Sequence, residues 1–160
     1  MPKIHLTTFI AAPPERVFDL SRNVSMHKIS MEHTGEEAVA GTTSGLINKD
    51  ETVTWKGKHL MKTRFFTSKI TEMKPYETFT DTMVKGDFRF FAHQHFFKPA
   101  DNGTIVIDII DYETPYGWFG QLVNKFYLKS YLEKLIRHRN EVIKQYAETD
   151  KWRALLSNRR

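Results

Sequence analysis

The segment from Asp87 to Lys98 contains two histidines, His93 and His95, with a single residue between them. Side chains two residues apart on a β-strand point to the same face, so both imidazoles would project together. An imidazole can exchange protons near neutral pH, bind a metal or orient a polar ligand group. The pair therefore marks a candidate site.

An acidic residue joins the histidines if the next strand, Thr104 to Glu113, pairs with theirs. The intervening Asp101-Asn102-Gly103 predicts a hairpin, because Asn-Gly suits the positive φ values of a tight type I′ turn. If the hairpin closes through Asn102-Gly103, paired positions sum to an odd number, which groups alternate residues of both strands. The resulting face carries Arg89, Phe91, His93, His95, Phe97, Val106, Asp108, Ile110 and Tyr112. The opposite face is more apolar, so either one is compatible with an inward position.

A second strand, Glu51 to His59, offers further candidates. Its alternation puts Glu51, Trp55 and His59 on one side and lysines on the other, and the lysine side should face water. We therefore expect Trp55 to face inward, with Glu51 and His59 near either end. His33, where a short helix enters the sheet, is expected near the rim of a cavity.

These residues allow four interpretations. The histidines and Asp108 could be a hydrogen-bonded structural cluster, since buried polar groups are normally paired. They could recognise a ligand, with Trp55, Phe91 and Phe97 contacting an apolar body while polar groups orient one end. The polar groups in that interpretation are His59, His93, Arg89 and Glu51.

The other two interpretations involve chemistry. In catalysis, His93, His95 or Glu51 would be a general base and Arg89 would stabilise an oxyanion. In metal binding, His93 and His95 would be joined by His59 and Glu51. We expect no metal and no cofactor, because two histidines on one face are a weak signal by themselves.

The pattern along the chain predicts how these residues are positioned. Alternating residues from Lys3 to Ile10 predict a strand, the double proline at 13 and 14 opens a short helix, and a second helix follows around Ser25 to Met31. Six strands come next, and Pro115 and Gly117 then precede one long helix. The strands are predicted at Glu36 to Ala40, Glu51 to His59, Met61 to Met73, Glu77 to Val84, Asp87 to Lys98 and Thr104 to Glu113.

The final helix is predicted from Gly117 to Ala147, which at 1.5 Å per residue spans roughly 46 Å. It must therefore cross the whole sheet. Its basic residues are predicted to form a solvated face: Lys129, Lys134, Arg137, Arg139 and Lys144.

Composition narrows the class of protein. The 160 residues predict one domain, at 1–150, followed by a basic tail at 151–160. Without cysteine, disulfides and thiolate sites are excluded. The net charge of +5 comes from dispersed lysines and arginines, so we expect no nucleic-acid partner. We expect a cytoplasmic protein without a membrane span, because no leader-like or long apolar run is present.

The order of elements and several motifs resemble the START-like or SRPBCC superfamily, also called polyketide cyclase/dehydrase. The resemblance covers residues 3 to about 147 and includes VFDL after the double proline and the Pro-x-Gly before the long helix. Four segments are similar to those of a small bacterial cyclase/dehydrase-like subgroup of this superfamily. They are MEHTGEEAVAGTTSGLI, ETVTW with His59 four residues later, DTMVKGDF and HQHFF.

The resemblance implies an α+β helix-grip fold, in which a curved antiparallel sheet of about seven strands wraps around a long C-terminal helix. It also implies a cavity between the sheet and this helix. It also favours the histidine face as the inward one. Family members include carriers, receptors and enzymes, so the fold leaves the reaction open. We expect a module that binds a small apolar or amphipathic molecule. The alternatives are a cofactor-independent cyclase, lyase or hydrolase and, third, a protein-interaction role.

Overall fold

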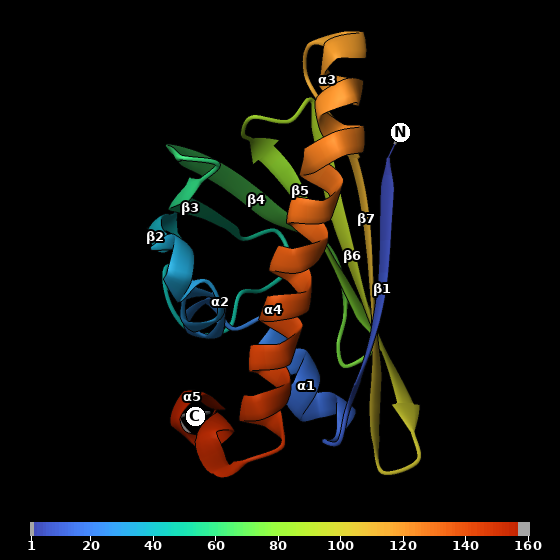
Figure 1. Ribbon diagram of the computed structural model, residues 1–160. Helices are drawn as coiled ribbons and strands as arrows, with labels where there is room; N and C mark the ends of the chain where they lie inside the picture. The colour runs from blue at the N-terminus through green and yellow to red at the C-terminus, as the bar shows by residue number, and fades with distance from the viewer. Residues whose placement is uncertain (1, 157–160) are drawn as a thin grey trace.

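The computed structural model describes residues 2–156 and consists of one curved seven-stranded antiparallel sheet and a long C-terminal helix (Figure 1). The strands lie in the order β1-β7-β6-β5-β4-β3-β2. The predicted α+β helix-grip class is confirmed. The strand bounds are β1 Lys3–Ile10, β2 Glu37–Gly41, β3 Thr52–His59, β4 Lys62–Lys74, β5 Thr78–Lys85, β6 Phe90–Ala100 and β7 Gly103–Glu113.

Two short helices, α1 (Pro14–Ser21) and α2 (Val24–Ser30), follow β1 in the sequence and precede β2. Proline at the first position of α1 needs no intrahelical N–H bond, and the Asn23 side chain caps α2 by accepting a hydrogen bond from the Met26 N–H at 2.9 Å. A 3₁₀ turn, Glu32–Thr34, leads into β2. Figure 1 shows both helices beside the C-terminal half of the long helix.

The long helix runs from Gly117 to Ala147 in three consecutive parts. These are α3 (Gly117–Val123), a π-helical segment (Asn124–Leu128) and α4 (Lys129–Ala147). Figure 1 shows the helix extending along the sheet. The π-helical segment contains Asn124, which accepts a hydrogen bond from the buried hydroxyl of Tyr112 on β7. The continuous helical run from Gly117 to Ala147 confirms the predicted extent of the helix.

The β6–β7 hairpin groups the residues of each face as predicted, but it closes through Asp101 and Asn102 instead of Asn102 and Gly103, so His95 lies opposite Asp108 and Phe91 opposite Tyr112. Its turn differs from the expected type I′, because only Asn102 of the two loop residues has a positive φ. Gly103 is needed for another reason. A Cβ there would lie 2.4 Å from the backbone oxygen of Ile10 on the neighbouring strand.

The chain after α4 belongs to the folded domain as far as it is described. Residues Asp150–Trp152 form a 3₁₀ turn and Arg153–Leu156 form α5, and Leu156 is buried in the main core. The sequence predicted a basic tail at 151–160. In the described part of this segment Lys151 and Arg153 are exposed, whereas Leu156 packs into the core. Arg159 and Arg160 lie outside the described residues.

Replacing Leu156 by alanine is expected to lower the free energy of unfolding by about 2–3 kcal/mol, since it removes buried methyl groups and leaves a cavity. Urea titration of wild type and variant measures the difference. Arg153→Ala, in the same short helix but exposed, is the matched control. Equal stabilities of the two variants would contradict the packing of α5.

Candidate functional site

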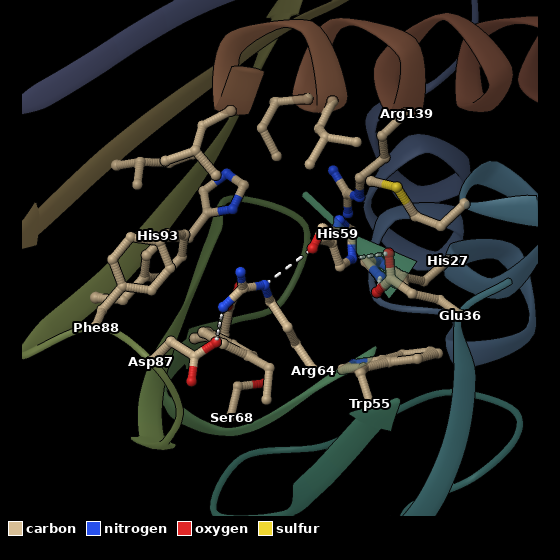
Figure 2. Close-up of a pocket in the computed structure, with 18 of the residues that line it drawn as sticks. His27, Glu36, Trp55, His59, Arg64, Ser68, Asp87, Phe88, His93 and Arg139 are labelled. Atoms are coloured by element: carbon tan, nitrogen blue, oxygen red, sulfur yellow. Dashed lines mark hydrogen bonds and ion pairs between the residues drawn. The ribbon is translucent and has the colours of Figure 1, made fainter. Parts of the chain in front are cut away.

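A pocket of about 600 Å³ lies between the inner face of the sheet and the long helix (Figure 2). This volume is within the range of small-molecule sites. Its walls are mainly apolar and come from both layers. They include Trp55, Phe66, Ile70, Phe91, Leu132 and Ile136.

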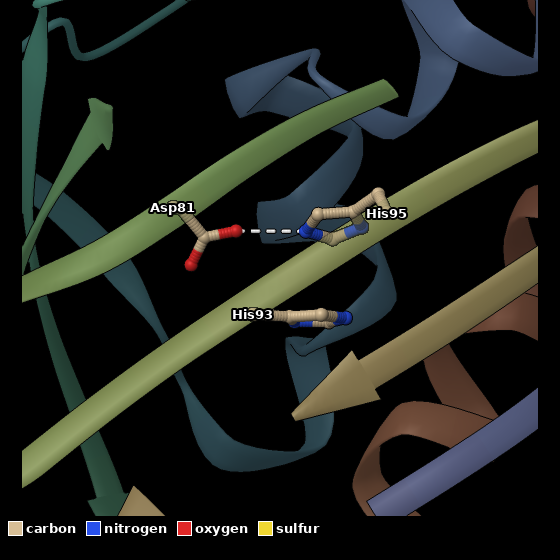
Figure 3. A group of neighbouring side chains, drawn as sticks. All are labelled: Asp81, His93 and His95. Carbon is tan, nitrogen blue, oxygen red and sulfur yellow. Dashed lines mark hydrogen bonds and ion pairs between the residues drawn. The ribbon is translucent and has the colours of Figure 1, made fainter. Parts of the chain in front are cut away.

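One polar group of the pocket is built on β5, β6 and β7. His93 and His95 are buried, and their rings stack with centroids 3.7 Å apart. Asp108 accepts a hydrogen bond from His93 Nε2 at 2.7 Å. Asp81 accepts one from His95 Nε2 at 2.7 Å (Figure 3). Asn140 of α4 donates to the second oxygen of Asp108 at 2.6 Å. The cluster therefore ties the centre of the sheet to the long helix.

The cluster separates the protonation of its two histidines. Burial, together with the charge of His95, lowers the pKa of His93. Burial also opposes charge on His95, but the carboxylates of Asp108 and Asp81 outweigh it and raise the pKa of that imidazole. The pKa of Asp108 is held well below its usual range, because both imidazoles outweigh the effect of burial. The arrangement favours a charged His95 beside a neutral His93.

Asp81, His93 and His95 have donor atoms within 4.8 Å of one another, which raises the question of a metal. Imidazole binds a metal in the plane of its ring. The two rings are inclined by only 22°, so an ion in the plane of one would lie out of the plane of the other. The Asp81–His95 hydrogen bond would also have to be displaced. We therefore interpret the cluster as a hydrogen-bonded network. Glu51 and His59, which would complete the ligand set in the metal-binding interpretation, are not members of this group.

A second polar group, around Glu36, faces the pocket from α2, β3 and α4. The carboxylate of Glu36 lies 3.1 Å from His27 Nε2 and 3.3 Å from His59 Nε2, and His59 Nδ1 contacts the Tyr131 hydroxyl at 2.7 Å. Burial would raise the pKa of Glu36, but the two imidazoles outweigh it and hold that pKa well below its usual range. Figure 2 shows His93 on one side of the pocket and the Glu36 group on the other.

Arg139 of α4 also lines the pocket. The sequence predicted a solvated arginine, and this is wrong, because the residue is only 5% exposed. Its Nη2 donates to the backbone oxygen of Ser21 at 2.8 Å. Burial lowers the pKa of Arg139, although an arginine remains protonated at any physiological pH. The pocket therefore contains a buried cation.

Five of the predicted ligand-binding residues line the pocket. The inward face of β6 is the histidine face, as the resemblance favoured, and Trp55 faces inward from β3. The five are Trp55, His59, Phe91, His93 and His95.

Six other candidates lie outside the lining. Three are buried elsewhere: Phe97 stacks on Phe79 in the core, Asp108 lies behind His93, and Tyr112 bonds to Asn124. The other three lie toward the surface. Arg89 is exposed and pairs with Glu113, His33 is exposed against His138, and Glu51 precedes β3, with its carboxylate bonded to the Asn48 N–H and the Thr42 hydroxyl.

Sequence reasoning missed several polar residues of the site. For Arg139 a signal existed, since it continues the apolar stripe Leu132, Ile136, Ile143 at helical spacing. The others depend on contacts between distant segments. They are Glu36, Asp81, Tyr131 and Asn140.

The sequence matches the model of the family described as polyketide cyclase / dehydrase and lipid transport over residues 10–138. The protein therefore belongs to this family, which is part of the superfamily that the sequence resembled. No curated protein matches the sequence. None of the helices in residues 2–156 is long and apolar enough to cross a membrane.

Solved structures agree with the fold. The protein TTHA0849 of Thermus thermophilus is similar with a TM-score of 0.75 and 20% identity, covering 91% of this chain and 97% of that one. The ZhuI aromatase/cyclase of Streptomyces sp. R1128 has a TM-score of 0.75 at 12% identity, with 98% of both chains covered. A major latex-like protein of Panax ginseng has a TM-score of 0.66 at 16% identity, covering 92% and 98%. At these identities the likeness concerns the fold alone.

Proposed function

We propose that the protein binds a small apolar or amphipathic molecule in the pocket between the sheet and the long helix, in the cytoplasm. The observation that carries the proposal is a 600 Å³ pocket with apolar walls and a few buried polar groups, the composition typical of small-molecule sites. Family membership supports it, since the family description includes lipid transport. One structural neighbour, from Streptomyces, is an aromatase/cyclase.

The mouth of the pocket supports the same proposal. Tyr116, Phe119 and Val123 border the pocket and are 79%, 57% and 42% exposed. Aromatic side chains bury a large apolar area when they contact a partner. An apolar molecule that enters from this end would therefore meet favourable contacts before it reaches the interior.

Trp55→Ala is expected to weaken binding of apolar ligands by about tenfold or more, because it removes a large apolar ring from the wall of the pocket. The measurement is a thermal-shift screen of apolar compounds, followed by calorimetric titration of those that raise the melting temperature. Trp152→Ala, which removes a tryptophan outside the pocket lining, is the matched control. If no apolar compound binds wild type, or if both variants lose binding equally, the proposal fails.

A second candidate function is acid–base catalysis without a cofactor in the same pocket. The observation in its favour is the stacked histidine pair, whose pKa values are displaced in opposite directions. His93 Nε2 donates to Asp108, so its Nδ1 is available as a proton acceptor when the ring is neutral. Neutral His93 is therefore the candidate general base.

His93→Gln is expected to abolish turnover of any substrate found, by a factor of about 10² or more, while ligand binding survives. Turnover is compared with wild type across pH, because the wild-type profile should follow the titration of the lost imidazole. His33→Gln, which changes an exposed histidine outside the pocket lining, serves as control. Unchanged turnover in His93→Gln would exclude this role.

A further inference from the structure

Arg139 is the one arginine among residues 2–156 that is both buried and directed to the pocket (Figure 2). Its guanidinium has five N–H donors. Two hydrogen bonds are present, from Nη2 to Ser21 O at 2.8 Å and from Nη1 to the Asn140 side chain at 3.4 Å. Three donors therefore remain for another partner.

Within the described part of the chain, Arg139 has no carboxylate within ion-pair distance, although three carboxylates lie in its surroundings. Each of those acids is already engaged. Asp108 accepts from His93 and Asn140, Asp81 accepts from His95, and Glu36 is shared by His27 and His59. A buried cation without an anionic partner is energetically costly. A ligand that supplies an anion would offset the cost of burying the Arg139 guanidinium.

We infer that the ligand carries one carboxylate, which pairs with Arg139 while its apolar body occupies the rest of the pocket. This inference rests on the proposed binding function. The planar guanidinium fork matches a carboxylate in a bidentate geometry. A dianionic phosphate fits less well, because one guanidinium balances only one of its two charges and the carboxylates of Asp81 and Glu36 also face the pocket.

The position of the arginine is compatible with this arrangement. Ile136, one turn before Arg139 on α4, and Leu132, one turn earlier, both line the pocket. A ligand bound to Arg139 could therefore extend its apolar part along this stripe toward the mouth at Phe119. The polar end would be the deeper one.

The test compares matched ligands that differ only in the charged group. The affinity of the protein for anthracene-9-carboxylate is compared with that for anthracene-9-methanol, and the affinity for dodecanoate with that for 1-dodecanol. Each compound is titrated separately into the protein, below its aggregation concentration, by fluorescence or calorimetry at pH 7.5. Wild type should bind at least one carboxylate tenfold or more tightly than its alcohol. Arg139→Met should remove the preference and retain alcohol binding, whereas Arg137→Met, exposed on the same helix, should keep it.

The outcomes separate this inference from the proposed function. If the affinities of wild type for each carboxylate and its alcohol differ by less than twofold, the role of Arg139 is overturned and the binding function stays intact. This comparison uses wild type alone and does not depend on the folding of a variant. A preference that persists in folded Arg139→Met would overturn it as well. Binding of neither member of either pair would overturn the binding function and, with it, this inference.

Discussion

Asp108→Ala is expected to lower the free energy of unfolding by about 3–5 kcal/mol, the effect of removing one partner from a buried charged network. The carboxylate is fully buried and accepts hydrogen bonds from His93 and Asn140, and it lies 3.4 Å from His95 Nδ1. Without it, the His93 and Asn140 donors lose their acceptor and the charge on His95 loses one of its two carboxylates. Urea unfolding measures the loss.

Asp111→Ala is the matched control, because Asp111 lies on the same strand and pairs at the surface with Lys3 at 3.5 Å. Exposed ion pairs contribute little, so its effect should stay below about 1 kcal/mol. Asp108→Asn should fall between the two variants, since it keeps the shape but loses the charge. An Asp108→Ala protein as stable as Asp111→Ala would show that the network does not stabilise the fold.

The β6–β7 face could be predicted from sequence because a shift of two residues in the register of a hairpin leaves the same residues on each face. Once the two strands meet through Asp101 and Asn102, alternation alone groups His93 and His95 with Asp108. Which face looks inward depends on the helix that covers the sheet. The resemblance to a known superfamily, rather than the hairpin pattern, favoured the correct face.

Errors arose where an element begins or where two distant segments meet. Glu51 was expected on the inner face of β3, but the strand begins at Thr52 and the Glu51 carboxylate closes the preceding turn through the Asn48 N–H at 2.7 Å. Arg89 similarly lies just before β6 and turns to Glu113. Alternation predicts a direction only for residues inside a strand.

The polar partners of the histidines could not be derived from local pattern. Asp81 pairs with His95 across β5 and β6, whose connecting loop is longer than a tight turn and does not determine register. Glu36 meets His27 and His59 only because α2 packs beside the end of the sheet. Arg139 was misassigned by its charge, although its helical position placed it in the apolar stripe.

The free energy of unfolding is expected to be greatest near about pH 6.5 and to fall on both sides, because the buried titratable groups act in opposite directions. Glu36 and Asp108 have pKa values held below those of the unfolded chain. Their contribution is fully present above about pH 5, is on the order of 2 kcal/mol for each group, and is lost as the pH falls. His93, whose pKa is also lowered, resists protonation in the folded state, so stability already begins to fall below about pH 6.5.

His95 produces the decline on the alkaline side. Its pKa is raised in the folded protein, so its contribution is complete below about pH 6.5 and disappears as the pH rises through the folded-state pKa. Urea titrations from pH 3 to pH 9 would measure both limbs. His95→Gln should flatten the alkaline limb and Glu36→Gln the part of the acid limb below about pH 5, whereas His33→Gln, at an exposed position, should change neither. An alkaline limb that persists unchanged in His95→Gln would mean that this imidazole does not carry the charge, and the general-base assignment of its neutral neighbour His93 would lose its basis.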